Sequence, residues 1–131
     1  MGQGGYLVLV NATDSDWELS HYHYYQMNEW SFPAEIPAGD FAQIYIEWDE
    51  GLFRFVKDDA AEARYELKGT GGKEFEVQAR AEPFRIQVSY MNMEPEGKER
   101  GGVDCLGWVR DGEITFVLSQ CNKGKYFIEY Y

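Results

Sequence analysis

The chain has 131 residues, of which 44% are hydrophobic and 17% aromatic, which excludes a disordered acidic tail. This length predicts one domain, residues 1–131, whose core folds without disulfide or metal staples. The 12 Lys and Arg against 23 Asp and Glu give a formal net charge of −11, which repels phosphate backbones, so no nucleic-acid partner is expected.

The first predicted element is a short apolar strand, Tyr6–Val10, followed by a turn cluster over Asn11–Asp16. No basic segment precedes this strand, and no apolar run approaches the roughly 20 residues that cross a bilayer. We therefore expect a protein that is not transmembrane, has no signal peptide and is cytoplasmic or otherwise intracellular. Asn11-Ala12-Thr13 fits the glycosylation sequon, but without an export signal we interpret it as a structural turn.

The next stretch, Trp17 to Phe32, is unusually rich in aromatic rings. Its first part, Trp17–Tyr25, is predicted to be an extended strand. Buried Tyr and Trp side chains need hydrogen-bond partners, and this density of rings exceeds what one core strand needs. We therefore expect some of the rings to be exposed, whereas Trp30 and Phe32 are expected in the core.

A tight turn, Ile36-Pro37-Ala38-Gly39, is predicted next, with Pro37 at its first corner and Gly39 free to take positive φ. It leads into a strictly alternating strand, Asp40–Trp48. The core face of this strand is predicted to carry Ala42, Ile44, Ile46 and Trp48. Tyr45 falls on the opposite, more polar face, from which it could join the preceding aromatic stretch.

A strand over Leu52–Val56 and a charged loop or single helical turn over Lys57–Glu62 are predicted to follow. A hairpin then begins, because apolar residues alternate on both sides of a glycine-rich segment. Its inward residues are predicted to be Tyr65, Leu67, Phe75, Val77 and Ala79.

The register of this hairpin follows from keeping the apolar residues on one face. Pairing Leu67 with Phe75 and Tyr65 with Val77 leaves Thr70-Gly71-Gly72 as a three-residue loop. The same register places Lys68 beside Glu74, which is favourable, and Glu66 beside Glu76, which is not.

The remaining elements are a strand over Phe84–Tyr90, a polar loop over Met93–Gly102, a hairpin and a final alternating strand, Tyr126–Tyr130. The hairpin turns at Asp111-Gly112, a strong hairpin signal. Its second strand is predicted to point Ile114, Phe116 and Leu118 inward.

The geometry of this hairpin predicts whether the two cysteines can form a disulfide. Its turn pairs Arg110 with Glu113 and so places Cys105 opposite Leu118, with Cys121 about 10 Å farther along the strand. That separation is too long for a disulfide within the chain. We expect two free thiols in a reducing compartment; a disulfide between chains stays open if either thiol is exposed.

Together these elements predict an all-β fold, a single-domain antiparallel β-sandwich of about nine short strands, ahead of a small barrel. Turn signals recur at roughly 8–12 residues, which is typical of that class.

The sequence offers little for catalysis or metal binding. His21 and His23 share one strand face, but a metal would need a further ligand such as Glu18 or Glu29, and there is no third histidine. Neither cysteine lies in a nucleophile motif that would use these imidazoles. The glycines of GTGGK and KERGG lack the strand-to-helix context of a phosphate loop. We therefore predict no catalytic residue, no metal and no cofactor, and not an enzyme.

Binding fits the aromatic excess better, because Tyr and Trp offer rigid amphipathic contact area at low entropic cost. They stack on sugar rings and attract quaternary ammonium headgroups. The predicted ligand-binding residues are Trp17, Tyr22, Tyr24, Tyr25, Trp30 and Tyr45. Their predicted hydrogen-bonding neighbours are Asp14, Asp16 and Asn28.

A family resemblance supports this hypothesis. A short strand ending in Asn and Thr, then a tryptophan, an aromatic-rich strand and an Ile-Pro-Ala-Gly turn resemble the opening of small cytolysin and lectin-like β-sandwiches over about the first 50 residues. These include actinoporin-like proteins and fungal fruit-body lectins, and the size and acidity are similar to those of aegerolysins. The resemblance implies a glycan or lipid-headgroup partner. The chain departs from actinoporins because it has no amphipathic N-terminal helix.

The competing hypothesis is a self-assembling structural or storage protein. Exposed tyrosines and predicted edge strands at Tyr6–Val10 and Lys125–Tyr131 would then join copies of the chain into a homo-oligomer or a larger assembly. The binding hypothesis predicts a concave aromatic pocket open to solvent, and the assembly hypothesis predicts that a second chain covers the same rings.

Overall fold

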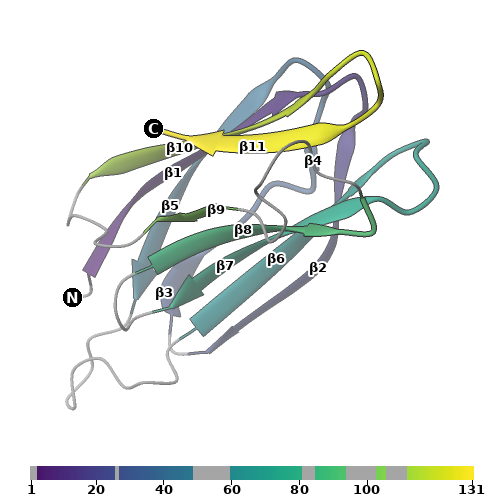
Figure 1. Cartoon of the computed structure of the whole chain (residues 1–131). Coiled ribbons are helices and arrows are strands. Elements are labelled where there is room, and N and C mark those ends of the chain that lie inside the picture. The colour runs from purple at the N-terminus through teal and green to yellow at the C-terminus, as the bar shows by residue number, and fades with distance from the viewer. Residues whose placement is uncertain (1–2, 26, 49–59, 81–84, 94–102, 106–111) are drawn as a thin grey trace.

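The computed structural model describes residues 3–25, 27–48, 60–80, 85–93, 103–105 and 112–131. These residues form two β-sheets that pack face to face (Figure 1), which confirms the predicted all-β sandwich. The strands are β1 (Gln3–Ala12), β2 (Trp17–Tyr25), β3 (Met27–Trp30), β4 (Glu35–Ile36), β5 (Phe41–Trp48), β6 (Ala60–Leu67), β7 (Glu74–Arg80), β8 (Arg85–Met91), β9 (Val103–Cys105), β10 (Glu113–Gln120) and β11 (Tyr126–Tyr130). The prediction of about nine strands missed the short β3 and β4, whose sequences alternate too briefly to be recognised.

The first sheet has the order β11-β10-β1-β5-β3 and the second the order β4-β2-β6-β7-β8-β9. Paired neighbours run antiparallel except β1 and β10, which are parallel. The prediction of Tyr6–Val10 as an edge strand is wrong, because β1 lies between β10 and β5. Its Val8 and Val10 are half-buried on the outer face, in addition to the buried Leu7 and Leu9, as suits a central strand. The C-terminal β11 is an edge strand, as predicted.

The core lies between the two sheets and follows the predicted alternation. In β5 the residues Ile44, Ile46 and Trp48 are buried. The inward residues of β10 are buried as well, so the faces of both strands are confirmed. At the C-terminus Tyr126 and Ile128 are buried, but Tyr130 is exposed at the sheet edge.

The β6–β7 hairpin has the predicted faces but a different register. Tyr65 pairs with Phe75 and Arg64 with Glu76, which is a shift of two residues. A shift of two keeps every apolar side chain on the core face. The longer connection is possible because Gly69, Gly71 and Gly72 all take positive φ. Glu76 therefore lies opposite Arg64, while Glu66 lies opposite Glu74, so a pairing of two glutamates remains but with a different partner.

The predicted hairpin at Asp111-Gly112 is wrong at the residues that the structure describes, because Cys105 does not lie opposite Leu118; residues 106–111 lie outside them. The strand β9 pairs with β8 in the second sheet, where Cys105 lies opposite Ile86, while β10 joins the first sheet. The chain therefore crosses between the sheets, and local turn chemistry does not report such a crossing. As predicted, Cys105 and Cys121 do not form a disulfide with each other.

Further predictions concern a charged segment, a turn, a strand and a loop. The Lys57–Glu62 segment is not all loop, because β6 already begins at Ala60. The turn after β4 is shifted by one residue: Asp40 donates its backbone N–H to Pro37 O at 3.0 Å, with Gly39 at φ 80°. The predicted Leu52–Val56 strand and most of the Met93–Gly102 loop lie outside the described residues.

Candidate functional site

A β-bulge in β2 decides which way the aromatic side chains point. The ladder between β2 and β6 shifts register between Leu19 and His21, so that Ser20 is an extra residue. Beyond the bulge Tyr22 lies opposite Ala63 and Tyr24 opposite Ala61. Because paired residues share a face, both tyrosines point to the inner side of the second sheet.

These two tyrosines stand over a groove at the open side of the sandwich, where β2 and β3 face each other. The groove has a volume of about 450 Å³. We call it the tyrosine groove; its lining includes Leu19, Tyr22, Tyr24, Met27, Asn28, Glu29, Trp30, Ser31 and Phe32. Tyr22 is 61% exposed and Tyr24 52% exposed, so solvent reaches both rings.

The floor of the groove is apolar and firmly held. The rings of Trp30 and Phe32 lie 4.5 Å apart, and the Trp30 indole N–H donates to the backbone oxygen of Glu62 at 3.3 Å. This bond joins β3 of the first sheet to β6 of the second. Beside the tyrosines, their partners on β6, Ala63 and Ala61, are small and buried.

The polar groups of the lining are an amide, a carboxylate and a hydroxyl, on Asn28, Glu29 and Ser31. The Asn28 side chain is oriented by Glu47, whose Oε2 accepts from Nδ2 at 2.8 Å. The other oxygen of Glu47 accepts from the Tyr45 hydroxyl at 2.7 Å. Because Tyr45 and Glu47 lie on the outer face of the first sheet, the bond to Glu47 holds the Asn28 amide toward that face and not into the groove.

Three of the six predicted ligand-binding residues, Tyr22, Tyr24 and Trp30, come together in this groove. Trp17 is 1% exposed and packs edge-on against Phe75, with ring centroids 4.6 Å apart, so it is a core residue. The other two lie on outer faces, Tyr25 on the second sheet and Tyr45 on the first.

Tyr45 does not join the aromatic stretch that precedes it in sequence. Its ring lies 5.3 Å from that of Tyr6 on the outer face of the first sheet. Among the predicted hydrogen-bonding neighbours only Asn28 lines the groove. Asp16 instead accepts from the backbone N–H of Ala38 at 2.9 Å, and Asp14 lies in the same β1–β2 connection.

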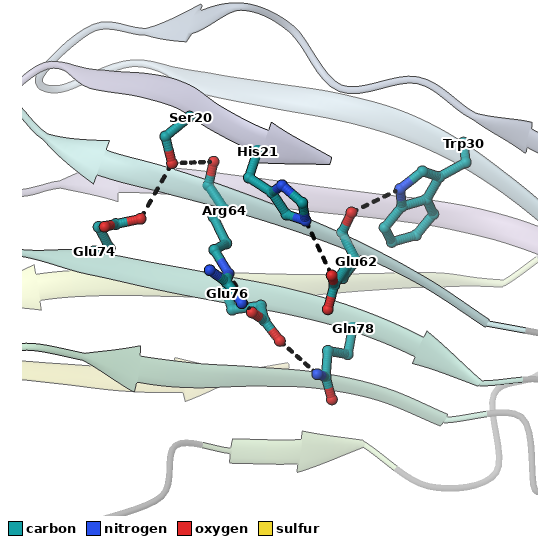
Figure 2. Close-up of polar contacts among 8 residues, drawn as sticks. All are labelled: Ser20, His21, Trp30, Glu62, Arg64, Glu74, Glu76 and Gln78. Carbon is teal, nitrogen blue, oxygen red and sulfur yellow. Dashed lines mark hydrogen bonds and ion pairs between the residues drawn. The ribbon is translucent and has the colours of Figure 1, made fainter. Parts of the chain in front are cut away.

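The two histidines share the outer face of the second sheet, as their spacing predicts. Figure 2 shows His21 beside Glu62, with Nε2 3.0 Å from Oε1, in a polar row across β2, β6 and β7. In the same row Arg64 Nε lies 2.6 Å from Glu76 Oε2, and Ser20 donates to Glu74 at 3.1 Å. Within the described ranges no three His, Cys, Asp or Glu side chains are grouped to hold a metal ion.

The cysteines are far from these imidazoles. Between β2 and β9 lie three strands, β6, β7 and β8, which separates Cys105 from the histidines by roughly 19 Å at the usual strand spacing. Burial, followed by the charge of Asp104, raises the pKa of the Cys105 thiol, which is the opposite of activation. Cys121 follows β10 in the other sheet.

Sequence reasoning missed five of the groove residues: Leu19, Met27, Glu29, Ser31 and Phe32 as a lining residue. Four of these lie in or directly after β3, a strand too short to predict. The sequence feature that could have identified these four residues is their proximity to Trp30 in the chain.

No protein-family model matches the chain, and no curated protein sequence matches it significantly. The described part of the chain contains no helix that is long and apolar enough to span a bilayer.

Proposed function

We propose that the protein is a non-enzymatic binding module of the lectin-like class, which takes a neutral sugar in the tyrosine groove. The observation that carries this proposal is the pair Tyr22 and Tyr24, which present exposed rings on one side of β2 above an apolar floor. Rigid aromatic walls with a few convergent polar groups are the usual composition of a small-molecule site.

The groove has the complementary chemistry for a sugar. A pyranose ring presents apolar C–H faces, which pack on aromatic rings, and hydroxyls around its rim, which need donors and acceptors. Among the lining residues, the hydroxyls of Tyr22, Tyr24 and Ser31 can both donate and accept. The volume of about 450 Å³ accommodates one or two sugar units.

Charge favours a neutral ligand over an anionic one, because the chain carries a formal net charge of −11. A quaternary ammonium headgroup is the other ligand that an aromatic groove beside a carboxylate attracts, by cation–π interaction. The binding experiment therefore includes phosphocholine as a separate arm.

The test is a glycan array with the full chain, followed by calorimetry with the strongest ligand and with phosphocholine. Tyr22→Ala and Tyr24→Ala should each weaken sugar binding by about tenfold or more, since truncating an aromatic anchor of a binding site costs about 1–2 kcal/mol or more. Tyr25→Ala is the matched control, because Tyr25 is equally exposed on the same strand but faces the other way.

The proposal fails if no glycan binds, or if Tyr25→Ala weakens binding as much as Tyr22→Ala. Binding of phosphocholine alone, lost in the two groove variants, would replace the sugar with a lipid headgroup at the same site.

Self-association through this surface is a second candidate, favoured by one observation. The strand β2 pairs with β4 only at Trp17 and Glu18, so within the described residues the rest of its outer edge has no strand beside it. Such an edge can pair with another chain. Light scattering on a size-exclusion column, with and without reductant and over a range of concentrations, separates the candidates: a mass near 15.2 kDa throughout supports the monomeric binding module.

A further inference from the structure

A second groove lies at one end of the sandwich, and its charge is opposite to that of the chain as a whole. It has a volume of about 630 Å³ and is lined by Lys73, Lys123 and Lys125 together with Asn92, Met93 and Gly124. We call it the lysine groove. The sequence has six lysines, so half of them line this one hollow in a chain of formal net charge −11.

The three lysines come from different parts of the fold. Lys73 follows the glycine-rich loop of the β6–β7 hairpin, and the other two belong to the β10–β11 turn. These two connections lie at the same end of the sandwich in Figure 1, at the right of the view. The convergence of the three side chains is therefore produced by tertiary structure and not by a basic run in the sequence.

The backbone under these lysines is well defined. In the β10–β11 turn the N–H of Gly124 donates to Cys121 O and the N–H of Cys121 donates to Lys125 O, both at 2.9 Å. The ammonium group of Lys73 lies 5.3 Å from the centre of the Tyr126 ring, over its face. These contacts fix where the lysines emerge.

The positive charges are not neutralised by carboxylates. Among the described residues, no Asp or Glu oxygen lies within 4 Å of Lys73, Lys123 or Lys125, whereas Lys68 on the same hairpin pairs with Glu18 at 3.2 Å. The pKa of the neighbouring Tyr126 is raised mainly by burial and secondly by the negative charge of Asp14. Like charges repel each other, so three ammonium groups around one hollow, with no carboxylate partner among the described residues, favour an external anion.

Asn92 contributes a neutral donor to the same hollow. It is the one non-glycine residue of the described chain with positive φ, at 57°, a conformation that asparagine tolerates better than most residues. Asn92 directly follows β8 and is one of the residues that line the groove.

We propose that the lysine groove is an oxyanion-binding site for a phosphate or sulfate group. Ammonium groups bind such anions as point charges, and the amide of Asn92 adds a hydrogen-bond donor. The site is separate from the tyrosine groove: the start of β2, at Trp17, pairs with Leu67 near the lysine end, while Tyr24 pairs with Ala61 toward the other end.

The test is a titration of the full chain that is monitored by two-dimensional ¹H–¹⁵N NMR. The probes are inorganic phosphate, inorganic sulfate and glucose 6-phosphate, and the ionic strength is held constant with NaCl. Glucose is the uncharged comparison. Saturable shifts at the amides of Lys73, Asn92 and Lys123–Lys125 are expected with the charged probes. Comparing the affinities for phosphate and for sulfate identifies the preferred oxyanion.

The Lys123→Gln/Lys125→Gln double variant should weaken phosphate binding by about tenfold or more, and Lys73→Gln by a similar factor, because charge-assisted bonds of this kind are about twice as strong as neutral ones. Lys68→Gln is the matched control and should leave the affinity unchanged. Shifts that never saturate, equal shifts with NaCl or glucose, or an equal loss in Lys68→Gln would overturn the proposal.

Discussion

The Asn11 side-chain oxygen accepts a hydrogen bond from the Thr13 hydroxyl at 2.6 Å, inside the first connection of the fold. Asn11 is fully buried, and its amide donates to Ser15 O at 2.8 Å and to Ile36 O at 2.9 Å. Both amide hydrogens are therefore used. The sequon Asn11-Ala12-Thr13 is a structural motif that joins β1, the β1–β2 connection and β4, but it is not all turn as predicted, because β1 continues to Ala12.

Replacing Asn11 tests this network. Asn11→Ala should lower the free energy of unfolding by about 3 kcal/mol, because it leaves two buried carbonyl oxygens without their donors. Asn11→Asp should cost at least as much, since a buried carboxylate would face those same oxygens. Denaturant unfolding measures both. The adjacent exposed Ala12, changed to Ser, should stay within about 0.5 kcal/mol of the native chain; equal losses at the two positions would contradict the account.

A second prediction concerns the ion pair between Arg64 and Glu76, which spans β6 and β7. Glu76 is 6% exposed, and its two carboxylate oxygens accept from Arg64 and from Gln78. A double-mutant cycle with Arg64→Ala and Glu76→Ala should give a coupling energy of about 1–2 kcal/mol. The exposed pair Lys68 and Glu18 is the control, and its coupling energy is expected to be smaller because solvent screens it. If the two cycles give the same value, the pair does not stabilise the register.

A third prediction is a loss of stability at alkaline pH. Burial raises the pKa of Tyr65 well above its ordinary value of about 10. Above about pH 10 the phenol ionises in the unfolded chain but not in the folded one. The unfolded state then binds fewer protons, so stability falls as pH rises, by about 1.4 kcal/mol per pH unit for this group. Tyr126, whose pKa is also raised by burial, acts in the same direction.

Tyr65→Phe isolates this effect. It removes the hydrogen bond from the Tyr65 hydroxyl to Pro33 O, 2.7 Å long, at a cost of about 1 kcal/mol at pH 7. The stability of the Tyr65→Phe variant should, however, fall less steeply between pH 10 and 11 than that of the native chain. Chemical unfolding at a series of pH values measures both slopes, and parallel slopes would show that Tyr65 titrates normally.

A fourth prediction is slow alkylation of Cys105. Its raised pKa, caused by burial and by Asp104, lowers the thiolate fraction at pH 8. In a Cys121→Ser variant, where only this thiol reports, iodoacetamide should react several-fold more slowly than with free glutathione. Denaturation should restore the rate. A rate equal to that of glutathione in the folded protein would contradict the assigned environment.

The fold was largely predictable from local alternation. In Asp40–Trp48 every second residue is apolar, so both the strand and its buried face could be read directly. The pairing partners of the strands could not be predicted in this way. The segment around Cys105 carries a strong turn signal, yet β9 and β10 belong to different sheets, because long-range packing overrides a local turn preference.

The candidate site was only half predictable for a related reason. The aromatic density of β2 pointed to Tyr22 and Tyr24, but their direction depends on the bulge at Ser20, which strict alternation does not include. Trp17 was assigned to the ligand surface because its type suits binding, whereas its indole donates to Thr13 at 3.3 Å within the core. Residue type alone does not separate these two roles.

The most direct test of the central claim follows the Trp30 indole N–H by two-dimensional NMR while a panel of neutral methyl glycosides is added. Trp30 forms the floor of the tyrosine groove, so its indole signal should shift saturably with at least one sugar. The buried Trp17 indole is an internal reference and should not move. A Trp30 signal that stays fixed with every glycoside, or a shift that survives in Tyr22→Ala/Tyr24→Ala, would contradict sugar binding in this groove.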